Sequence, residues 1–189
     1  MIENENTTAR PTRVLHDWWE RRRGERIMPT RSELDPSELK PILRDLIVIG
    51  IEQGGDGDRA RFVYRLAGTE IDDRLGIALK GMSLDAAPIG AIRDSIQAQY
   101  ETVVREGRPV FCSHSMVVNG ERYVEYDRLA VPLSDDAGRK TVALLAAVDF
   151  RCAYPIEYGR PALCARPHYC DRIDLCLAPR ACEATARGG

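Results

Sequence analysis

The segment from Arg61 to Asp85, RFVYRLAGTEIDDRLGIALKGMSLD, determines the fold that the sequence predicts. Its first part alternates apolar and charged side chains, with Phe62, Tyr64 and Leu66 at every second position. This two-residue period is typical of a strand with one buried face. The alternation stops at Gly68, so the sequence predicts a strand that ends there.

A short helix is predicted directly after this strand. Thr69 is a candidate N-cap with Asp72 three residues later, and Ile71 and Leu75 share one face of the helix. Gly76 can close the helix in a left-handed conformation. A strand followed by a small helix that folds over the sheet leaves space between the two, where a small ligand can bind.

The phrase FVYRLAGTEIDDRLG, followed after four residues by GMSLD, resembles the core of PAS-type sensory domains, in the single-domain subfamily common in alphaproteobacteria. Further phrases match in the same order. They are WWERRRGERIMPTRSELDPSELKPILRDLIVI upstream, and YETVVREGRPVF and RLAVPLSDDAGR downstream. The resemblance covers residues 14–150 and implies a stand-alone sensory domain that signals through contacts.

The rest of the chain predicts an α+β fold of the same kind, independently of the resemblance. A long helix is expected over residues 88–106, closed by Gly107, and Asn119-Gly120 is a strong hairpin signal. We expect a PAS-like five-stranded antiparallel sheet covered by helices on one face. The predicted strands are 46–51, the strand that begins at Arg61, 109–118, 121–133 and 141–150.

Four regions are expected along the chain. Residues 1–10 form a disordered lead, 11–34 an N-terminal flanking helix and linker, 35–150 the PAS-like domain, and 151–189 a tail rich in cysteine and proline. In the flanking helix, Trp18 and Trp19 lie on one apolar stripe. They either pack on the outer side of the sheet or form a contact between two copies, and we predict a homodimer through this helix.

Composition excludes several functional classes. The 189 residues are 44% hydrophobic and 30% charged, with a net charge of −2, which favours neither disorder nor nucleic-acid binding. No apolar run approaches the roughly 20 residues that span a bilayer. The N-terminus is polar and unlike a signal peptide. We therefore expect a cytoplasmic protein with no membrane partner and no nucleic-acid partner.

An arginine cluster is best interpreted as a solvated face; its members are Arg21, Arg22, Arg23, Arg26 and Arg31.

The cavity expected between the sheet and its helices is the candidate ligand site. Arg128 is the most informative member, because an arginine that points inward must be paired or bind an anion. Its direction depends on strand register, which the sequence leaves open. The candidate wall residues are Tyr64, Leu66, Ile96, Tyr100, His114, Tyr126 and Arg128.

No cofactor is predicted for this cavity. A flavin photosensor of this fold carries a reactive cysteine on its small helices, and the corresponding phrase TEIDDRLG has none. Haem needs an axial ligand, and the long helix has no histidine or cysteine. His114, with Cys112 on the same strand face, is the remaining candidate, but a histidine satisfied by a hydrogen bond is the more common arrangement.

The tail contains a degenerate six-residue repeat with its own chemistry. Four cysteines at this spacing, together with a histidine, could hold zinc or an iron–sulfur cluster, although zinc ligands usually come in closer pairs. Redox switching and a tail without any site are the other interpretations. The residues concerned are Cys164, Cys170, Cys176, Cys182 and His168.

The sequence favours a non-enzymatic regulatory protein that acts in signal transduction by binding a partner protein or a small metabolite. It contains no nucleophile elbow and no phosphate-binding loop. One alternative is a metal or redox sensor based on the cysteine tail. Another is a small enzyme, such as an isomerase, whose base is an acidic residue of the cavity; the candidates are Asp72, Asp73, Glu125 and Asp127.

Overall fold

The computed structural model describes residues 10–52, 60–118, 122–157 and 160–161. Its helices and strands follow the predicted order, with short 3₁₀ helices before the first strand and before the long helix. The elements are α1 (Pro11–Arg23), η1 (Arg31–Glu33), η2 (Pro36–Asp45), β1 (Leu46–Glu52), β2 (Arg61–Ala67), α2 (Thr69–Leu75), η4 (Gly90–Ile92), α3 (Arg93–Glu106), β3 (Val110–Val118), β4 (Arg122–Ser134), β5 (Thr141–Glu157) and β6 (Arg160–Pro161).

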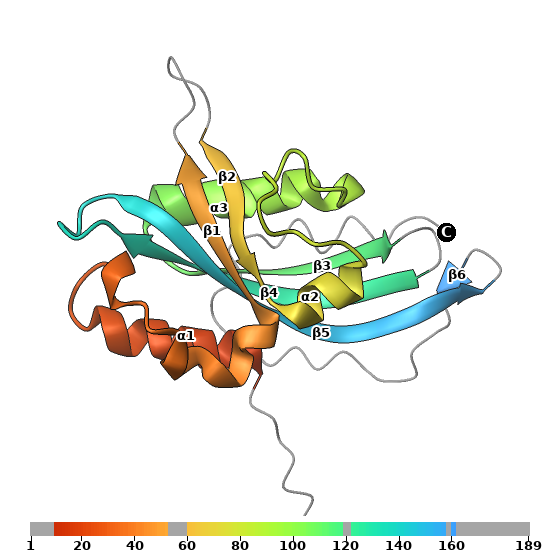
Figure 1. The fold of residues 1–189 in the computed structure, drawn as a ribbon, viewed down its shortest axis with the longest axis horizontal. Helices are drawn as coiled ribbons and strands as arrows, with labels where there is room; N and C mark the ends of the chain where they lie inside the picture. Colours follow the sequence, from red (N-terminus) through yellow and green to blue (C-terminus); the bar gives the residue numbers. More distant parts are fainter. Residues whose placement is uncertain (1–9, 53–59, 119–121, 158–159, 162–189) are drawn as a thin grey trace, which may run out of the picture.

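The strands form one sheet in the order β2-β1-β5-β4-β3, and every neighbouring pair is antiparallel (Figure 1). This confirms the predicted five-stranded antiparallel sheet of an α+β fold. Two details differ from the sequence prediction. Strand β5 continues beyond Phe150 to Glu157, and the two-residue strand β6 pairs with its end, so both lie in the segment predicted as tail.

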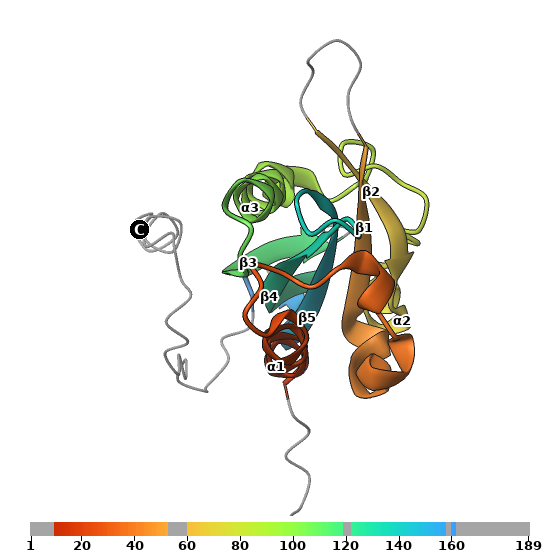
Figure 2. The same cartoon turned by 90° about the vertical axis from the view of Figure 1, so that its left-hand side faces the viewer.

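Helices α2 and α3 cover one face of the sheet, as predicted, and the N-terminal flanking helix α1 packs with η2 on the other face. Strands β4 and β5 are central, and their side chains alternate between two apolar clusters. Leu144 and Ala146 pack toward α2 and α3, whereas Leu145 and Ala147 pack toward α1 and η2. Figures 1 and 2 both show α3 and α1 on opposite sides of the strands. The continuous apolar run in β5 is the sequence signal for a strand that is buried on both faces.

Helix α1 packs on the outer face of the sheet, as one of its two interpretations predicted. Trp18 and Trp19 are buried, and the indole N–H of Trp19 donates to the carbonyl oxygen of Pro132 at 2.8 Å. The indole N–H of Trp18 donates to Glu38 at 3.0 Å. These side chains therefore supply no exposed apolar surface for a second copy. Pairing of two chains through this helix stays a prediction.

A residue of the sheet caps the N-terminus of α1. Asp149 of β5 accepts hydrogen bonds from the hydroxyl of Thr12, at 2.5 Å, and from its backbone N–H. Burial raises the pKa of Asp149, although the hydrogen bonds from Thr12 oppose this rise. No side chain of α1 caps its own N-terminus. The carboxylate therefore replaces a local cap and ties the helix to the strand beneath it.

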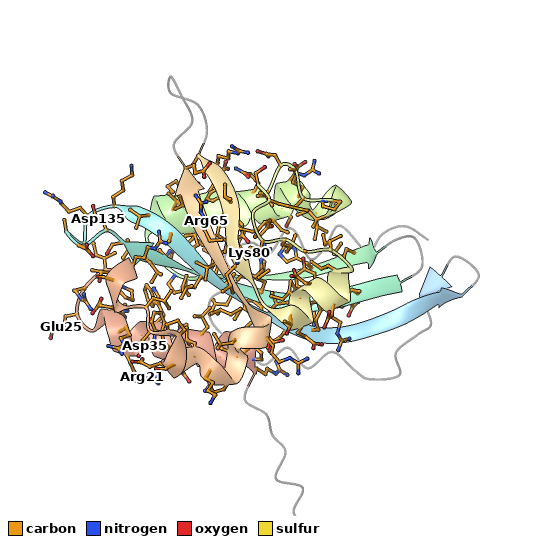
Figure 3. The ribbon with its side chains drawn as sticks, in the orientation of Figure 1. Arg21, Glu25, Asp35, Arg65, Lys80 and Asp135 are labelled. Atoms are coloured by element: carbon orange, nitrogen blue, oxygen red, sulfur yellow. The ribbon has the colours of Figure 1, made fainter. Side chains whose placement is uncertain are left out.

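Several members of the arginine cluster form ion pairs within the chain. Arg22 pairs with Glu38, Arg23 with Glu20, and Arg26 with Glu33. Arg21 and Glu25 are exposed, and Figure 3 places both at the outer side of the molecule near α1. This agrees with the interpretation of the cluster as a solvated face.

The alternation in β2 breaks after Tyr64, which corrects the prediction for Leu66. Phe62 and Tyr64 are buried as predicted, but Leu66 is 40% exposed. The pairing with β1 shifts at this point: Ile49 opposes Tyr64, and Val48 opposes Leu66, so Arg65 is an extra residue. A β-bulge of this kind reverses the facing of the residues that follow it.

The turn from β2 into α2 depends on Gly68. Gly68, and not Thr69, is the N-cap residue of α2, and no side chain caps the helix. The N–H of Gly68 donates to the carbonyl oxygen of Leu46 at 2.9 Å, which holds this turn against β1. At the other end, Gly76 has φ +67° and closes the helix as predicted.

The long helix begins later than predicted and ends where expected. The segment predicted as its first turn forms the 3₁₀ helix η4, and α3 itself starts at Arg93. Gly90 within this segment has φ +58°, a conformation that an α-helix does not contain. Gly107 has φ +63° and closes α3 as predicted.

Replacing Gly68 with alanine is expected to destabilise the chain by about 3 kcal/mol, because backbone atoms cannot move aside as a side chain can. A Cβ at this position would lie 2.1 Å from the carbonyl oxygen of Arg44. Urea unfolding measures the loss. The matched control is Gly138→Ala, which is strained only by its φ of +70° and meets no atom within 4 Å; about 1 kcal/mol is expected there. Equal losses for the two variants would contradict the argument.

Candidate ligand site between the sheet and helices α2 and α3

A cavity lies between the sheet and the helices that cover its inner face. Its wall is mostly apolar, with three polar side chains on the sheet side, and none of the described residues that line it is an aspartate or a glutamate. The residues that line it are Ile47, Tyr64, Ile71, Leu75, Leu79, Ile89, Ile92, Ile96, Tyr126, Arg128, Val148 and Phe150.

The cavity has a volume of about 20 Å³. Pockets that hold small organic ligands measure roughly 300–1,000 Å³, whereas a single water needs roughly 10–15 Å³. In this conformation the space accommodates water and not a metabolite. Binding of any larger molecule therefore requires the covering segments to move away from the sheet.

Arg128 is the charged group of the cavity wall. It lies on the central strand β4, points inward and is 2% exposed. Its Nε and Nη2 donate to the amide oxygen of Gln99, at 2.7 and 2.5 Å, and its guanidinium lies 5.0 Å from the ring centre of Tyr100. Within the described part of the chain, these hydrogen-bond and ring partners carry no negative charge. The structure thus shows that the register of β4 turns Arg128 into the cavity, which the sequence left open.

Gln99 connects helix α3 to the sheet through this arginine. Besides accepting from Arg128, its amide nitrogen donates to the carbonyl oxygens of Val110 at 2.8 Å and of Arg128 at 3.3 Å. The sequence prediction did not include Gln99. The sequence does indicate that Gln99 is buried, because it lies on the apolar stripe of the helix, three residues after Ile96 and four before Val103.

Three tyrosines surround the guanidinium and remain protonated at neutral pH. Burial raises the pKa of Tyr126 to about 12, and burial also raises the pKa of Tyr64 and of Tyr100. The hydroxyl of Tyr100 is buried without a well-formed hydrogen bond, although the hydroxyl of Tyr64 is near enough to affect its pKa. The cluster therefore presents hydroxyl donors next to a positive charge.

His114 lies on β3 and is buried and neutral. Burial, and then the charge of Arg128, lower its pKa from 6.5 to about 3. Its Nε2 lies 3.4 Å from Nη2 of Arg128. Because a guanidinium only donates, this contact needs an unprotonated Nε2. The imidazole also stacks against Tyr126 at 5.3 Å between ring centres.

Six of the seven predicted cavity residues come together in the structure, and one does not. Tyr64, Ile96, Tyr126 and Arg128 line the cavity, and Tyr100 and His114 contact Arg128. Leu66 is the exception, because the bulge in β2 turns it to the outside.

The acidic residues considered for an isomerase lie elsewhere. Asp72 accepts the backbone N–H of Leu79 at 3.2 Å and closes a turn, and Asp127 pairs with Ser113 and Arg151. None of the four acidic candidates lines the cavity. The tail candidates Cys164, Cys170, Cys176, Cys182 and His168 lie outside the described residues.

A sequence model of the PAS domain family matches residues 7–146. The chain therefore belongs to the PAS domain family, whose members are generally sensory domains of signal transduction. The membership agrees with the resemblance found in the sequence. The alphaproteobacterial stand-alone subfamily stays a prediction. Among the described residues, no helix is long and apolar enough to cross a membrane.

The chain is also similar to several solved structures, among them the following two. One is an RNA-binding Light-Oxygen-Voltage receptor, at 17% identity and a TM-score of 0.39; the match covers 56% of this chain and 29% of the receptor. The other is the PAS domain of Bordetella pertussis BvgS, at 15% identity and a TM-score of 0.38, covering 64% of this chain and 88% of that domain. A search of curated proteins gives no match.

Acidification is expected to destabilise the chain through His114. The pKa of this imidazole is about 3 in the folded state and 6.5 ordinarily, so unfolding takes up a proton between these values. The stability it contributes is complete above pH 6.5 and is lost as the pH falls toward 3. Between about pH 7.5 and about pH 5 the loss is about 2 kcal/mol.

Urea unfolding of the wild type and of His114→Asn at both pH values measures this loss. The variant lacks the titrating group, so its stability is expected to fall by about 2 kcal/mol less than that of the wild type. The same decrease in both proteins would contradict a buried neutral His114.

Proposed function

We propose that this chain is a non-enzymatic sensory protein of signal transduction, which binds a small metabolite between its sheet and helix α3 and thereby alters its contact with a partner protein. Membership of the PAS domain family supports the sensory class. The absence of acidic residues among those that line the cavity supports binding without catalysis.

One observation carries the proposal: the helix that covers the cavity is attached to the sheet by a residue of the cavity wall. Gln99 of α3 accepts two hydrogen bonds from Arg128 and donates to backbone carbonyl oxygens of β3 and β4. A molecule that contacts Arg128 changes the acceptors available to this guanidinium. Occupation of the cavity is therefore coupled to the position of α3.

The small size of the cavity supports a change of shape on binding. A metabolite larger than the space of about 20 Å³ must displace the covering segments. These are α2, η4 and α3, which contribute Ile71, Ile92 and Ile96 to the wall. Their opposite sides face away from the sheet, so their displacement alters the surface that a partner protein meets.

Filling the cavity is expected to reduce ligand occupancy. Val148→Ile adds one methyl group at the cavity wall, which stabilises the fold by about 0.8 kcal/mol if the group fits the existing space. Native mass spectrometry of the full chain, purified from the organism that produces it, measures the fraction that carries a small molecule. At least a threefold smaller fraction is expected for the variant.

The matched control is Val131→Ile, which adds the same group on the other face of the sheet, where Val131 is buried against α1 and η2. This change is expected to cost about 1 kcal/mol by overpacking and to leave occupancy unchanged. Hydrogen exchange gives a second readout, with altered protection in α3 and unchanged protection in α1 when ligand is removed. Wild-type protein that carries no small molecule would contradict the proposal.

A further inference from the structure

We infer that the molecule bound at this site is a small organic carboxylate, whose charged group contacts Arg128 and whose apolar part lies against the helices. The inference rests on the proposed function and specifies the chemical class of its ligand. It is drawn from the imbalance of charge and of hydrogen-bond donors around Arg128.

The charge imbalance is the first part of the argument. A guanidinium that is 2% exposed has lost its hydration and needs compensation. Its hydrogen-bond and cation–π partners that the described residues provide are the amide oxygen of Gln99, the neutral imidazole of His114 and the ring of Tyr100. An amide and an aromatic ring compensate a buried cation less well than an anion does. A carboxylate ligand supplies the missing negative charge.

The donors also outnumber the acceptors. Arg128 has five N–H groups, of which Nε and Nη2 both donate to the single amide oxygen of Gln99, and Nη2 also lies 3.4 Å from Nε2 of His114. The hydroxyl of Tyr100 is buried without a well-formed hydrogen bond. A carboxylate has two oxygens with about four acceptor sites, so it can satisfy these donors together.

The rest of the wall fits an apolar chain and not a second charge. Across the cavity from Arg128, α2 and α3 contribute Ile71, Leu75 and Ile96, and Phe150 lies beside Val148 on the sheet side. None of the lining residues is acidic, and Arg128 is the one charged residue among them. The wall therefore selects a monocarboxylate with a short hydrocarbon chain over a dicarboxylate or an amine.

Binding exchanges one acceptor for another. When the carboxylate takes the Nη1 and Nη2 donors of Arg128, the amide oxygen of Gln99 loses the hydrogen bond from Nη2. Gln99 keeps its donor bonds to Val110 and to the backbone of Arg128 only if α3 stays in place. Movement of α3 away from the sheet both enlarges the cavity and releases Gln99. Contact between a carboxylate and Arg128 therefore explains why occupation of the cavity changes the position of α3.

Butyrate and butyramide are matched probes, because they share a hydrocarbon chain and differ in charge. Full-length wild-type protein at neutral pH is titrated with each, and two-dimensional ¹H–¹⁵N NMR follows the Nε–H signal of Arg128 and the side-chain amide of Gln99. Butyrate is expected to shift both signals in a saturable manner. Butyramide is expected to bind at least tenfold more weakly.

Variants separate recognition by Arg128 from general effects of salt. Arg128→Lys assigns the Nε–H signal by its loss, retains a positive charge without the planar fork, and is expected to weaken butyrate binding at least tenfold. The control is Arg65→Lys, which makes the same change at an exposed arginine of β2; its affinity for butyrate is expected to equal that of the wild type. If Arg128→Lys does not fold, the comparison of butyrate with butyramide on wild-type protein still tests whether the site prefers a carboxylate.

Two results would overturn the inference. The first is equal binding of butyrate and butyramide, or no saturable shift with either. The second is recovery of an uncharged molecule from the native protein. That second result would contradict the carboxylate as the ligand but would leave the proposed sensory function intact. The two proposals can therefore be tested separately.

Discussion

The structure depends above all on how the buried charge of Arg128 is accommodated. An arginine cannot shed its proton, so a guanidinium that is 2% exposed must find its compensation inside the protein. Gln99 provides the acceptor and, through its amide nitrogen, also satisfies carbonyl oxygens of Val110 and Arg128. This pair of side chains therefore joins α3 to the sheet, and its arginine also lines the cavity.

The two faces of the sheet differ in the side chains that they bury. On the outer side, α1 and η2 pack through Leu15, Trp18 and Leu39, and polar groups such as the indole of Trp19 have well-formed partners. On the inner side, the cavity, the arginine and the donor-rich tyrosines occur together. Both faces contribute a buried apolar core, but among the described residues only the inner one contains a buried cation beside a cavity.

Much of the fold was predictable from local patterns. The strand alternation up to Tyr64 and the closing glycines Gly76 and Gly107 predicted β2, α2 and the end of α3. These features depend on neighbouring residues alone, so periodicity and backbone preference are sufficient. Predictions at element boundaries were weaker. Thr69 was assigned as an N-cap because of its side chain, whereas the backbone contact of Gly68 with Leu46 places the cap one residue earlier.

Local sequence patterns were enough to predict the class of fold, the order of the strands along the chain and most of the residues around the cavity. The folded structure was needed to show that Leu66 points outward, that Arg128 points inward and that Gln99 is its partner. The physical reason is that the facing of a strand residue depends on its register with other strands. A bulge at Arg65, or a contact between α3 and β4, joins residues that no local period relates.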